Sequence, residues 1–314
     1  MSEVRFTAVS RTQGNNAALK DGTVVPKGFA LDFIEVPVLV QAFRRMVRGL
    51  EFDICEMALT TFLCAREHGV RFTALPVFLV RAFHHGAIVV HRNSGIDDPK
   101  QLEGRRVAVG RGYTVTTGVW ARSILADEYG VDLGRITWVL TGDEHVEAYQ
   151  PPPNVVPLEP GATIEEQLKS GELAAAVNVG SDDPDIRPLI PEALEAGIAA
   201  FRRSGHYPIN HLVVVRDDVL EAHPDLAVAL FEAFTESKRL YLERLRSGDV
   251  DPLTDPDRLH LRMLEYVDDP LPYGLEPNRR VLESLIGHAM SQQILRKPVA
   301  IESLFAPTTV GLTG

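Results

Sequence analysis

The spacing of apolar residues changes between two periods along the first half of the chain. Alternation and short apolar runs indicate strands, whereas apolar residues three or four apart indicate the buried face of a helix. On this basis we expect strands over residues 4–9, 32–36, 51–55, 72–80, 86–92 and 105–110. Helical spacing predicts helices over 38–50, 56–69 and 116–130, and a short helix that begins at Asp98-Pro99, where proline suits the first helical position.

The second half of the chain continues the alternation of strands and helices. We expect strands at 136–140, 173–179 and 211–220, and helices after a capping box at Thr163 and Glu166, from Pro224 to about Ser247, and over 276–296. Residues 141–162 are rich in proline and glycine and are predicted to be a loop. Strands that alternate with helices predict an α/β fold with largely parallel sheets.

Composition narrows the class of protein. The chain has 314 residues, of which 45% are apolar, so it can bury a core without disulfides, and its two cysteines are expected to be buried hydrophobes. Its net charge of -11 argues against nucleic acid or an anionic membrane as a general partner. The first residues lack a secretory signal and no apolar run spans a bilayer, so we expect a soluble, cytoplasmic protein, although a chain trimmed of its leader would look the same.

Common cofactor motifs are absent. The stretch GRGYTVTTG has Gly110 and Gly112 but lacks the glycine spacing of a dinucleotide site, and no GxxxxGK[ST] or GxSxG occurs. The ten histidines show neither HExxH nor any paired metal-ligand spacing. We therefore assign no cofactor and no metal ligand, and whether a metal ion assists stays open.

A polar interruption stands between two apolar runs in PVFLVRAFHHGAIVV, residues 76–90. Arg81, His84 and His85 lie between stretches that both look buried. A guanidinium is rarely buried without a partner. Either the chain reaches the surface here, or an anionic group meets Arg81.

Three stretches resemble the type II periplasmic-binding-protein fold. They are IDDPKQLEGRRVAVG (96–110), TIEEQLKSGELAAAV (163–177) and HLVVVRDDVLEAHPDLAVALFEAF (211–234). The resemblance implies two lobes, with lobe one at 1–87 and 206–314 and lobe two at 88–205. It also implies a ligand cleft between the lobes, where strand ends meet.

A narrower resemblance extends over nearly the whole chain. The stretches RGLEFDICEMALTTFLCAREHG, ALPVFLVRAFHHGAIVVH, HYPINHLVVVRDD and, most specifically, PLPYGLEPNRRVLESLIGHAMSQQIL are similar to the 4,5-dihydroxyphthalate decarboxylase family. The chain departs from the pattern at His84, where the family is expected to have arginine, and at Asn210, where an apolar residue is expected. The resemblance implies a carboxy-lyase without a cofactor, acting on a small hydroxylated aromatic carboxylate.

Substrate-binding candidates follow from the need to hold carboxylates. Arg81 can grip a carboxylate in bidentate fashion, and Arg11 ends the first strand. The start of the helix at 116–130 offers free N–H groups with the hydroxyls of Thr114, Thr116 and Thr117. For each candidate a structural role is the alternative: an ion pair for Arg81, a solvated loop for Arg11, and N-capping for the threonines.

Catalytic candidates follow from the need to protonate a ring carbon, for which histidine is suited near neutral pH. We name His85 and His211 ahead of His84, with His206 and Tyr207 as nearby candidates. Glu56 is expected to open the helix at 56–69 and to face the cleft together with Thr60, one turn later. The alternatives are solvated or core histidines, a capping role for Glu56 and back-bonding for Thr60.

Two other functions share the same fold. A solute-binding protein that captures a small carboxylate would have the same pocket, and the histidines beside Arg81 favour the enzyme over it. An effector domain of a transcription factor is disfavoured, because neither a DNA-binding helix pair nor a basic patch is visible. A homo-oligomer is compatible with the sequence, which does not fix the oligomeric state or the substitution pattern of the ring.

Overall fold

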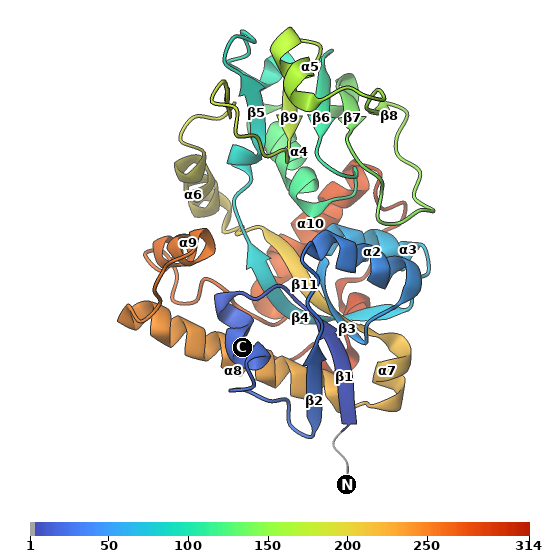
Figure 1. The fold of residues 1–314 in the computed structure, drawn as a ribbon, viewed down its shortest axis with the longest axis vertical. Helices are drawn as coiled ribbons and strands as arrows, with labels where there is room; N and C mark the ends of the chain where they lie inside the picture. The colour runs from blue at the N-terminus through green and yellow to red at the C-terminus, as the bar shows by residue number, and fades with distance from the viewer. Residues whose placement is uncertain (1–3) are drawn as a thin grey trace. The chain divides into compact units, whose positions relative to one another are not determined.

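The computed structural model describes residues 4–314 and divides the chain into two compact units (Figure 1). Unit 1 comprises the chain up to Ala82, Ile209–Glu283 and Val299–Gly314, and unit 2 comprises Phe83–Pro208 and Ser284–Pro298. The segment Ser284–Pro298 was predicted in lobe one and belongs to unit 2 instead.

Polar contacts explain why this segment joins unit 2. The side chain of Gln292 donates to the carbonyl of Val119 at 3.1 Å and accepts from Arg122 Nε at 2.8 Å. Both partners are buried in unit 2, so separating the segment from them would leave buried polar groups without hydrogen bonds.

Unit 1 is built on a five-stranded mixed sheet. Its strands are β1 (Val4–Val9), β2 (Phe29–Phe33), β3 (Ile54–Ala58), β4 (Phe72–Arg81) and β11 (Ile209–Arg216), in the order β2-β1-β3-β11-β4. β1 runs parallel to β2 and β3, and β11 is antiparallel to both of its neighbours, β3 and β4. β11 is therefore inserted between β3 and β4, where its apolar residues are buried.

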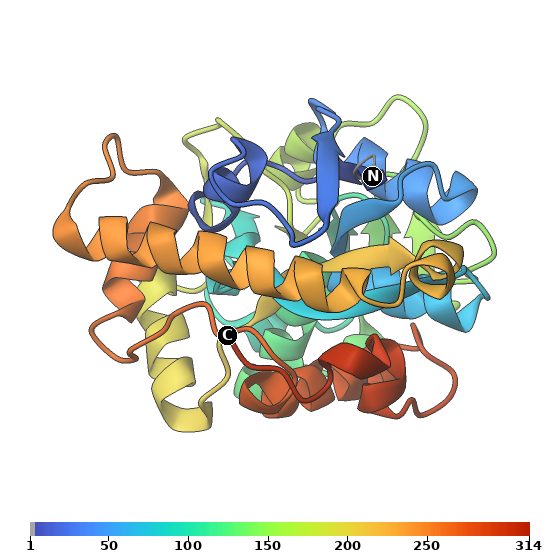
Figure 2. The ribbon, with the colours of Figure 1, turned by 90° about the horizontal axis from the view of Figure 1, so that it is seen from below.

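Seven α-helical segments within residues 4–314 belong to unit 1. They are α1 (Ala17–Lys20), α2 (Leu39–Gly49), α3 (Leu59–Glu67), α7 (Asp217–Ala222), α8 (Leu226–Ser247), α9 (Asp255–Met263) and the start of α10 (Arg279–Ser291). Of these, α2, α3, α7 and α8 contact the strands of the sheet. The long helix α8 packs against β4 (Figure 2). Leu226, Phe234 and Leu245 of α8 are buried, because apolar residues at these spacings recur on one helical face.

Unit 2 contains a six-stranded mixed sheet. Its strands are β5 (Ile88–His91), β6 (Arg106–Val109), β7 (Thr137–Leu140), β8 (Val155–Pro157), β9 (Ala175–Val177) and β10 (Ile186–Pro188), in the order β10-β5-β9-β6-β7-β8. Its helices are α4 (Thr116–Tyr129), α5 (Ile164–Ser170) and α6 (Ala193–Ser204), followed by the remainder of α10. A core cluster joins the sheet to α5 through Ala108, Val139, Leu168, Leu173 and Ala176.

The predicted α/β fold is confirmed, and several local predictions are wrong. The sheets are mixed rather than largely parallel, because β11 and β5 run antiparallel to both of their neighbours. The expected loop 141–162 contains the edge strand β8, whose short Val-Val-Pro sequence is a weak strand signal. Glu56 does not open a helix: it lies in the middle of β3, and α3 begins only at Leu59.

The structure contains neither a membrane-spanning helix nor a cluster of metal ligands in residues 4–314. No helix there is both long and apolar enough to cross a bilayer. Nor do three or more His, Cys, Asp or Glu side chains in that range gather where they could hold a metal ion.

A buried histidine in α9 gives unit 1 a specific sensitivity to acid. His260 Nδ1 lies 2.8 Å from the Tyr241 hydroxyl, which donates to Asp257 at 2.6 Å. Burial, opposed by the attraction of Asp257, lowers the pKa of His260 to about 4. The unfolded chain, with a histidine pKa of about 6.5, takes up this proton first, so stability falls as the pH drops from about 6.5 to about 4.

We expect this histidine to account for roughly 3 kcal/mol of the stability that the protein loses over that range of pH. His260→Gln should therefore lose less unfolding free energy between pH 7.0 and pH 4.5 than the wild type does, as measured by urea titration. His223→Gln, at a half-exposed histidine of the same unit, serves as the control. An equal loss in His260→Gln and the wild type would contradict the assignment.

Candidate functional site

A buried carboxylate is the centre of a polar network in unit 1. The Glu56 side chain is fully buried in the sheet, and four groups donate to it, the longest contact being from Gln13 Nε2 to Oε1 at 3.5 Å. His211 Nδ1 lies 2.6 Å from Oε1, while the Ser10 hydroxyl and the Arg11 backbone N–H each donate to Oε2 at 2.9 Å. These contacts supply the hydrogen bonds that a buried carboxylate requires.

Sheet register explains why these residues meet. Glu56 of β3 is paired with Val213 of β11, and His211 stands two residues from Val213 on the same face of the sheet. Such diagonal neighbours are within reach of long side chains. On the other side of β3, Val9 of the parallel strand β1 pairs with Cys55. Ser10 and Arg11, which follow Val9, therefore lie beside Glu56.

The charge state of Glu56 follows from this environment. Burial acts to raise its pKa, but the hydrogen bond and charge of His211, the Ser10 hydroxyl and the charge of Arg11 outweigh burial, so the pKa lies below its ordinary value. Glu56 is therefore a carboxylate at neutral pH. A carboxylate accepts and cannot donate, so His211 carries a proton on Nδ1.

The second ring nitrogen of His211 is not used by the contact with Glu56. Within residues 4–314 no hydrogen-bond partner is found for Nε2, and 19% of the His211 side chain is exposed. The ring is held edge-on to Phe43, with centroids 5.2 Å apart and planes at 88°. A histidine fixed through Nδ1 by a carboxylate presents Nε2 as a positioned proton donor or acceptor.

Polar residues after β1 complete the network, and sequence analysis missed them. Asn16 Nδ2 donates to the Ser10 hydroxyl at 2.7 Å and to the Arg11 carbonyl at 2.9 Å, and its Oδ1 accepts from the Gln13 N–H at 2.8 Å. The sequence signal for these residues is the polar run SRTQGNN directly after the apolar strand β1. Of this run, only Arg11 was predicted to be a site residue.

The Arg11 side chain is available to a ligand. It is exposed, and its guanidinium makes no hydrogen bond or ion pair with any residue of the range 4–314. Its backbone N–H is fixed on Glu56, and its charge lowers the pKa of that carboxyl. Arg11 thus places a positive charge beside the Glu56–His211 pair, as a carboxylate-binding residue would.

Arg81 has partners inside unit 1. Its buried guanidinium donates to the Asn278 side chain and, at 3.3 Å, to the Pro272 carbonyl, and it lies 5.8 Å from the centre of the Phe78 ring. Asn278 is held in turn by its own bonds to the carbonyls of Pro272 and Gly274. The buried Arg81 guanidinium therefore has hydrogen-bond acceptors within the protein. Its role as a substrate-binding residue stays a prediction.

Thr60 and the two histidines after Arg81 lie outside the Glu56 network. Thr60 is fully buried in the first turn of α3. His84 and His85 belong to unit 2 and are also buried. His85 Nε2 lies 2.9 Å from Glu128 Oε1, in a pocket described below.

The predicted anion site at the start of α4 holds a carboxylate of the protein itself. The backbone N–H groups of Tyr113 and Thr114 and the Thr114 hydroxyl, at 2.7 Å, all donate to Glu144. A Cβ at Gly112 would come within 2.5 Å of the Glu144 carboxylate, so a larger residue at this position would displace that side chain.

Two charge effects favour a carboxylate at this position. The buried Arg122 guanidinium donates to the Tyr113 carbonyl at 2.7 Å, and the α4 N-terminus adds its dipole. Thr116 and Thr117 lie in the first turn of α4 and the N-cap residue is Val115, so the alternative role of these threonines as N-caps does not hold.

Comparison with curated proteins finds two relatives of the same name. The chain is 29% identical to a 4,5-dihydroxyphthalate decarboxylase of Comamonas testosteroni over 287 residues, covering 86% of this chain and 87% of that protein. It is 30% identical to a 4,5-dihydroxyphthalate decarboxylase of Pseudomonas putida over 158 residues, covering 50% of this chain and 60% of that protein.

Family profiles and solved structures identify the fold. Residues 34–151 match the family described as ABC transporter, phosphonate, periplasmic substrate-binding protein. The periplasmic aliphatic sulphonate-binding protein SsuA from Escherichia coli matches with a TM-score of 0.56 at 13% identity, over 98% of both chains. The desulfurization enzyme DSZB matches with a TM-score of 0.57 at 15% identity, over 96% of both chains. The chain is thus similar in sequence to 4,5-dihydroxyphthalate decarboxylases and has the fold of the periplasmic binding proteins, as its sequence resemblance predicted.

Proposed function

We propose that this protein is a carboxy-lyase that decarboxylates a hydroxylated aromatic carboxylate of the 4,5-dihydroxyphthalate type. The names of the two curated relatives support the reaction class. The observation that carries the proposal is the Glu56–His211 pair, in which a buried carboxylate fixes one ring nitrogen and leaves the other to exchange a proton. A protein that only bound a solute would not need such a pair.

The reaction needs a proton delivered to carbon. A hydroxyl para to the carboxylate pushes electron density into the ring, and the ring carbon that bears the carboxylate takes the proton from His211 Nε2. The bond to the carboxylate then breaks, its electron pair restores the aromatic ring, and CO2 leaves. Glu56 stabilises the imidazolium before the transfer, and solvent returns a proton to the neutral imidazole afterwards.

Arg11 has a separate role in this proposal. A dicarboxylate keeps one carboxylate through the reaction, and the exposed guanidinium of Arg11 is suited to bind it. The second carboxylate must be less strongly bound, since tight charge pairing would oppose its conversion to neutral CO2.

The decisive experiment is an assay of CO2 release by the purified protein with a panel of hydroxyphthalates and hydroxybenzoates in heavy water. We expect CO2 from a substrate with a hydroxyl para to a carboxylate, and one deuterium at the vacated ring carbon. The alternative, a solute-binding protein, predicts binding of the same acids by calorimetry without any CO2.

We expect Arg11→Ala to raise KM for the dicarboxylate by roughly 10- to 100-fold with a smaller effect on kcat, because one charge-assisted contact is lost. Initial rates over a range of substrate concentrations provide the measurement. Arg5→Ala removes the same charge from an exposed ion pair with Asp32 and is the matched control. Equal KM values for both variants and the wild type would assign the remaining carboxylate to another residue.

A further inference from the structure

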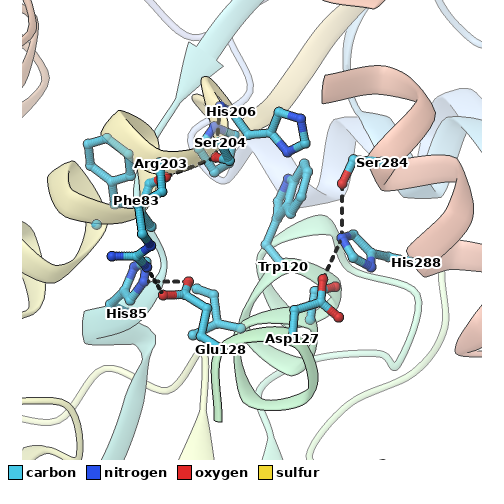
Figure 3. A pocket seen from close by; sticks show the side chains of 15 residues that line it. Phe83, His85, Trp120, Asp127, Glu128, Arg203, Ser204, His206, Ser284 and His288 are labelled. Atoms are coloured by element: carbon cyan, nitrogen blue, oxygen red, sulfur yellow. Dashed lines mark hydrogen bonds and ion pairs between the residues drawn. The ribbon is translucent and has the colours of Figure 1, made fainter. Parts of the chain in front are cut away.

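A cavity of about 200 Å³ lies within unit 2, apart from the Glu56 network (Figure 3). Its walls come from α4, α6, α10 and the segments next to Phe83 and Pro208. Small residues create the space: Gly197, Ala200 and Ser204 are spaced three and four apart along α6, so they share one face of that helix. The small side chains of α6 therefore contribute part of this space.

Apolar atoms form most of the cavity surface, although nine of the 15 lining residues are polar or charged. Trp120 of α4 and Phe83 both line the cavity, together with Ile124. A Cβ at position 197 would come within 2.5 Å of the Phe83 ring, so Gly197 is what allows Phe83 to take this position. Cavities of about 150 Å³ with apolar walls hold a benzene ring, so the volume here suits one six-membered ring with a substituent.

Charged groups stand at two sides of the cavity (Figure 3). On one side, Glu128 Oε1 lies 2.9 Å from His85 Nε2, and Oε2 accepts from Arg203 at 2.9 Å. The positive charge of Arg203 therefore neutralises the negative charge of Glu128. On the other side Asp127 is mostly exposed, and within residues 4–314 its one ion-pair contact is His288 Nε2 at 3.7 Å. Asp127 thus keeps capacity to accept a hydrogen bond.

The geometry around His288 excludes nucleophilic catalysis by a serine. The Ser284 hydroxyl lies 3.1 Å from His288 Nε2, and the Asp127 carboxylate approaches the same nitrogen. In a catalytic triad the carboxylate instead holds the opposite nitrogen, Nδ1, and so orients the ring. The arrangement is suited to binding a ligand and not to acyl transfer.

We propose that this cavity is a second small-molecule site, which takes a neutral monocyclic aromatic compound with a hydroxyl group, of the phenol class. The ring lies between Trp120 and Phe83, where aromatic edges and faces pair favourably. The hydroxyl donates to Asp127. A benzoate is disfavoured, because its carboxylate would meet the carboxylate of Asp127 while Arg203 is already paired with Glu128.

The protein contains two tryptophans, which provide an internal comparison. Trp120 lines the cavity, whereas Trp138 is fully buried in β7 and does not. We expect phenol to shift the indole N–H signal of Trp120 in a saturable manner in ¹⁵N-correlated NMR spectra, and to leave that of Trp138 in place. Trp138→Phe assigns the two signals. Benzoate should bind at least ten times more weakly.

Substitutions at adjacent positions of α6 test the location. Ala200→Leu fills the cavity and should weaken phenol binding at least tenfold. Ala199→Leu adds the same side chain at an exposed position that does not line the cavity and should bind phenol as the wild type does. If Ala200→Leu lowers the midpoint of thermal unfolding, Ala200→Val tests the same wall with less added volume.

Unchanged phenol affinity in the folded Ala200 variants, or equal affinity for benzoate, would overturn the proposal. Because the readout is binding at Trp120 and not CO2 release, this result is independent of the proposed decarboxylase activity.

Discussion

His211→Asn is expected to lower kcat for CO2 release by roughly 10²-fold or more while KM changes little. The reason is that Nε2 of His211 is the atom we assign to proton delivery, and asparagine has no group that titrates near neutral pH. The variant can still donate a side-chain N–H toward Glu56, so the sheet around it should persist. Steady-state rates and the incorporation of solvent deuterium into the product ring measure the effect.

A histidine outside the network controls for this change. His223→Asn alters a half-exposed histidine of unit 1 that packs on Phe6 and Phe29, and it should release CO2 at the wild-type rate. His85→Asn should also remain active, because His85 is bound to Glu128 in unit 2. If His211→Asn kept a normal kcat and His85→Asn lost it, the proton donor would be the other histidine predicted from the sequence.

The second large effect is expected for Glu56→Gln, with a decrease in kcat of roughly 10²-fold. A neutral amide cannot stabilise the imidazolium of His211, so the protonated donor becomes less available. The substitution also places an NH2 group or a neutral oxygen opposite the Ser10 hydroxyl and the Arg11 N–H, which both donate to Oε2 in the wild type. We therefore expect a lower midpoint of thermal unfolding as well, and kcat must be expressed per folded molecule.

Glu103→Gln is the control that separates the effect on kcat from the effect on stability. The Glu103 side chain is also largely buried and bonded, to Lys100, Arg135 and the Asp132 N–H, but it lies in unit 2 and outside the network. It should lose stability without losing kcat. Equal kcat values for Glu56→Gln and Glu103→Gln would show that Glu56 has only a structural role.

Secondary structure was largely predictable, because apolar spacing reports which face of an element is buried. β1 was predicted at its observed bounds, and α2, β4, α4 and α8 were found within a few residues. Errors arose where burial on all sides removed the periodic signal. Ile54–Ala58 is buried throughout, so its strand could not be separated from the helix that follows, and Glu56 was assigned to the wrong element.

The candidate residues of unit 1 were recognised from the sequence one by one, but their grouping was not. Arg11, Glu56 and His211 were each named for their chemistry, and Arg81 was named beside them. The structure gives Arg81 its own acceptors and brings His211 to Glu56. A residue type indicates what a side chain can do, whereas the identity of its partner depends on strands far apart in the chain.

The sequence by itself determined the α/β class, the family resemblance and the chemical types at hand: carboxylates, imidazoles, guanidinium groups and a polar run after the first strand. Only the tertiary structure decided that β11 inserts antiparallel between β3 and β4, so that residues 155 positions apart form a 2.6 Å hydrogen bond. The physical reason is that local periodicity sets which face a side chain takes, but strand order and register follow from the packing of the whole sheet.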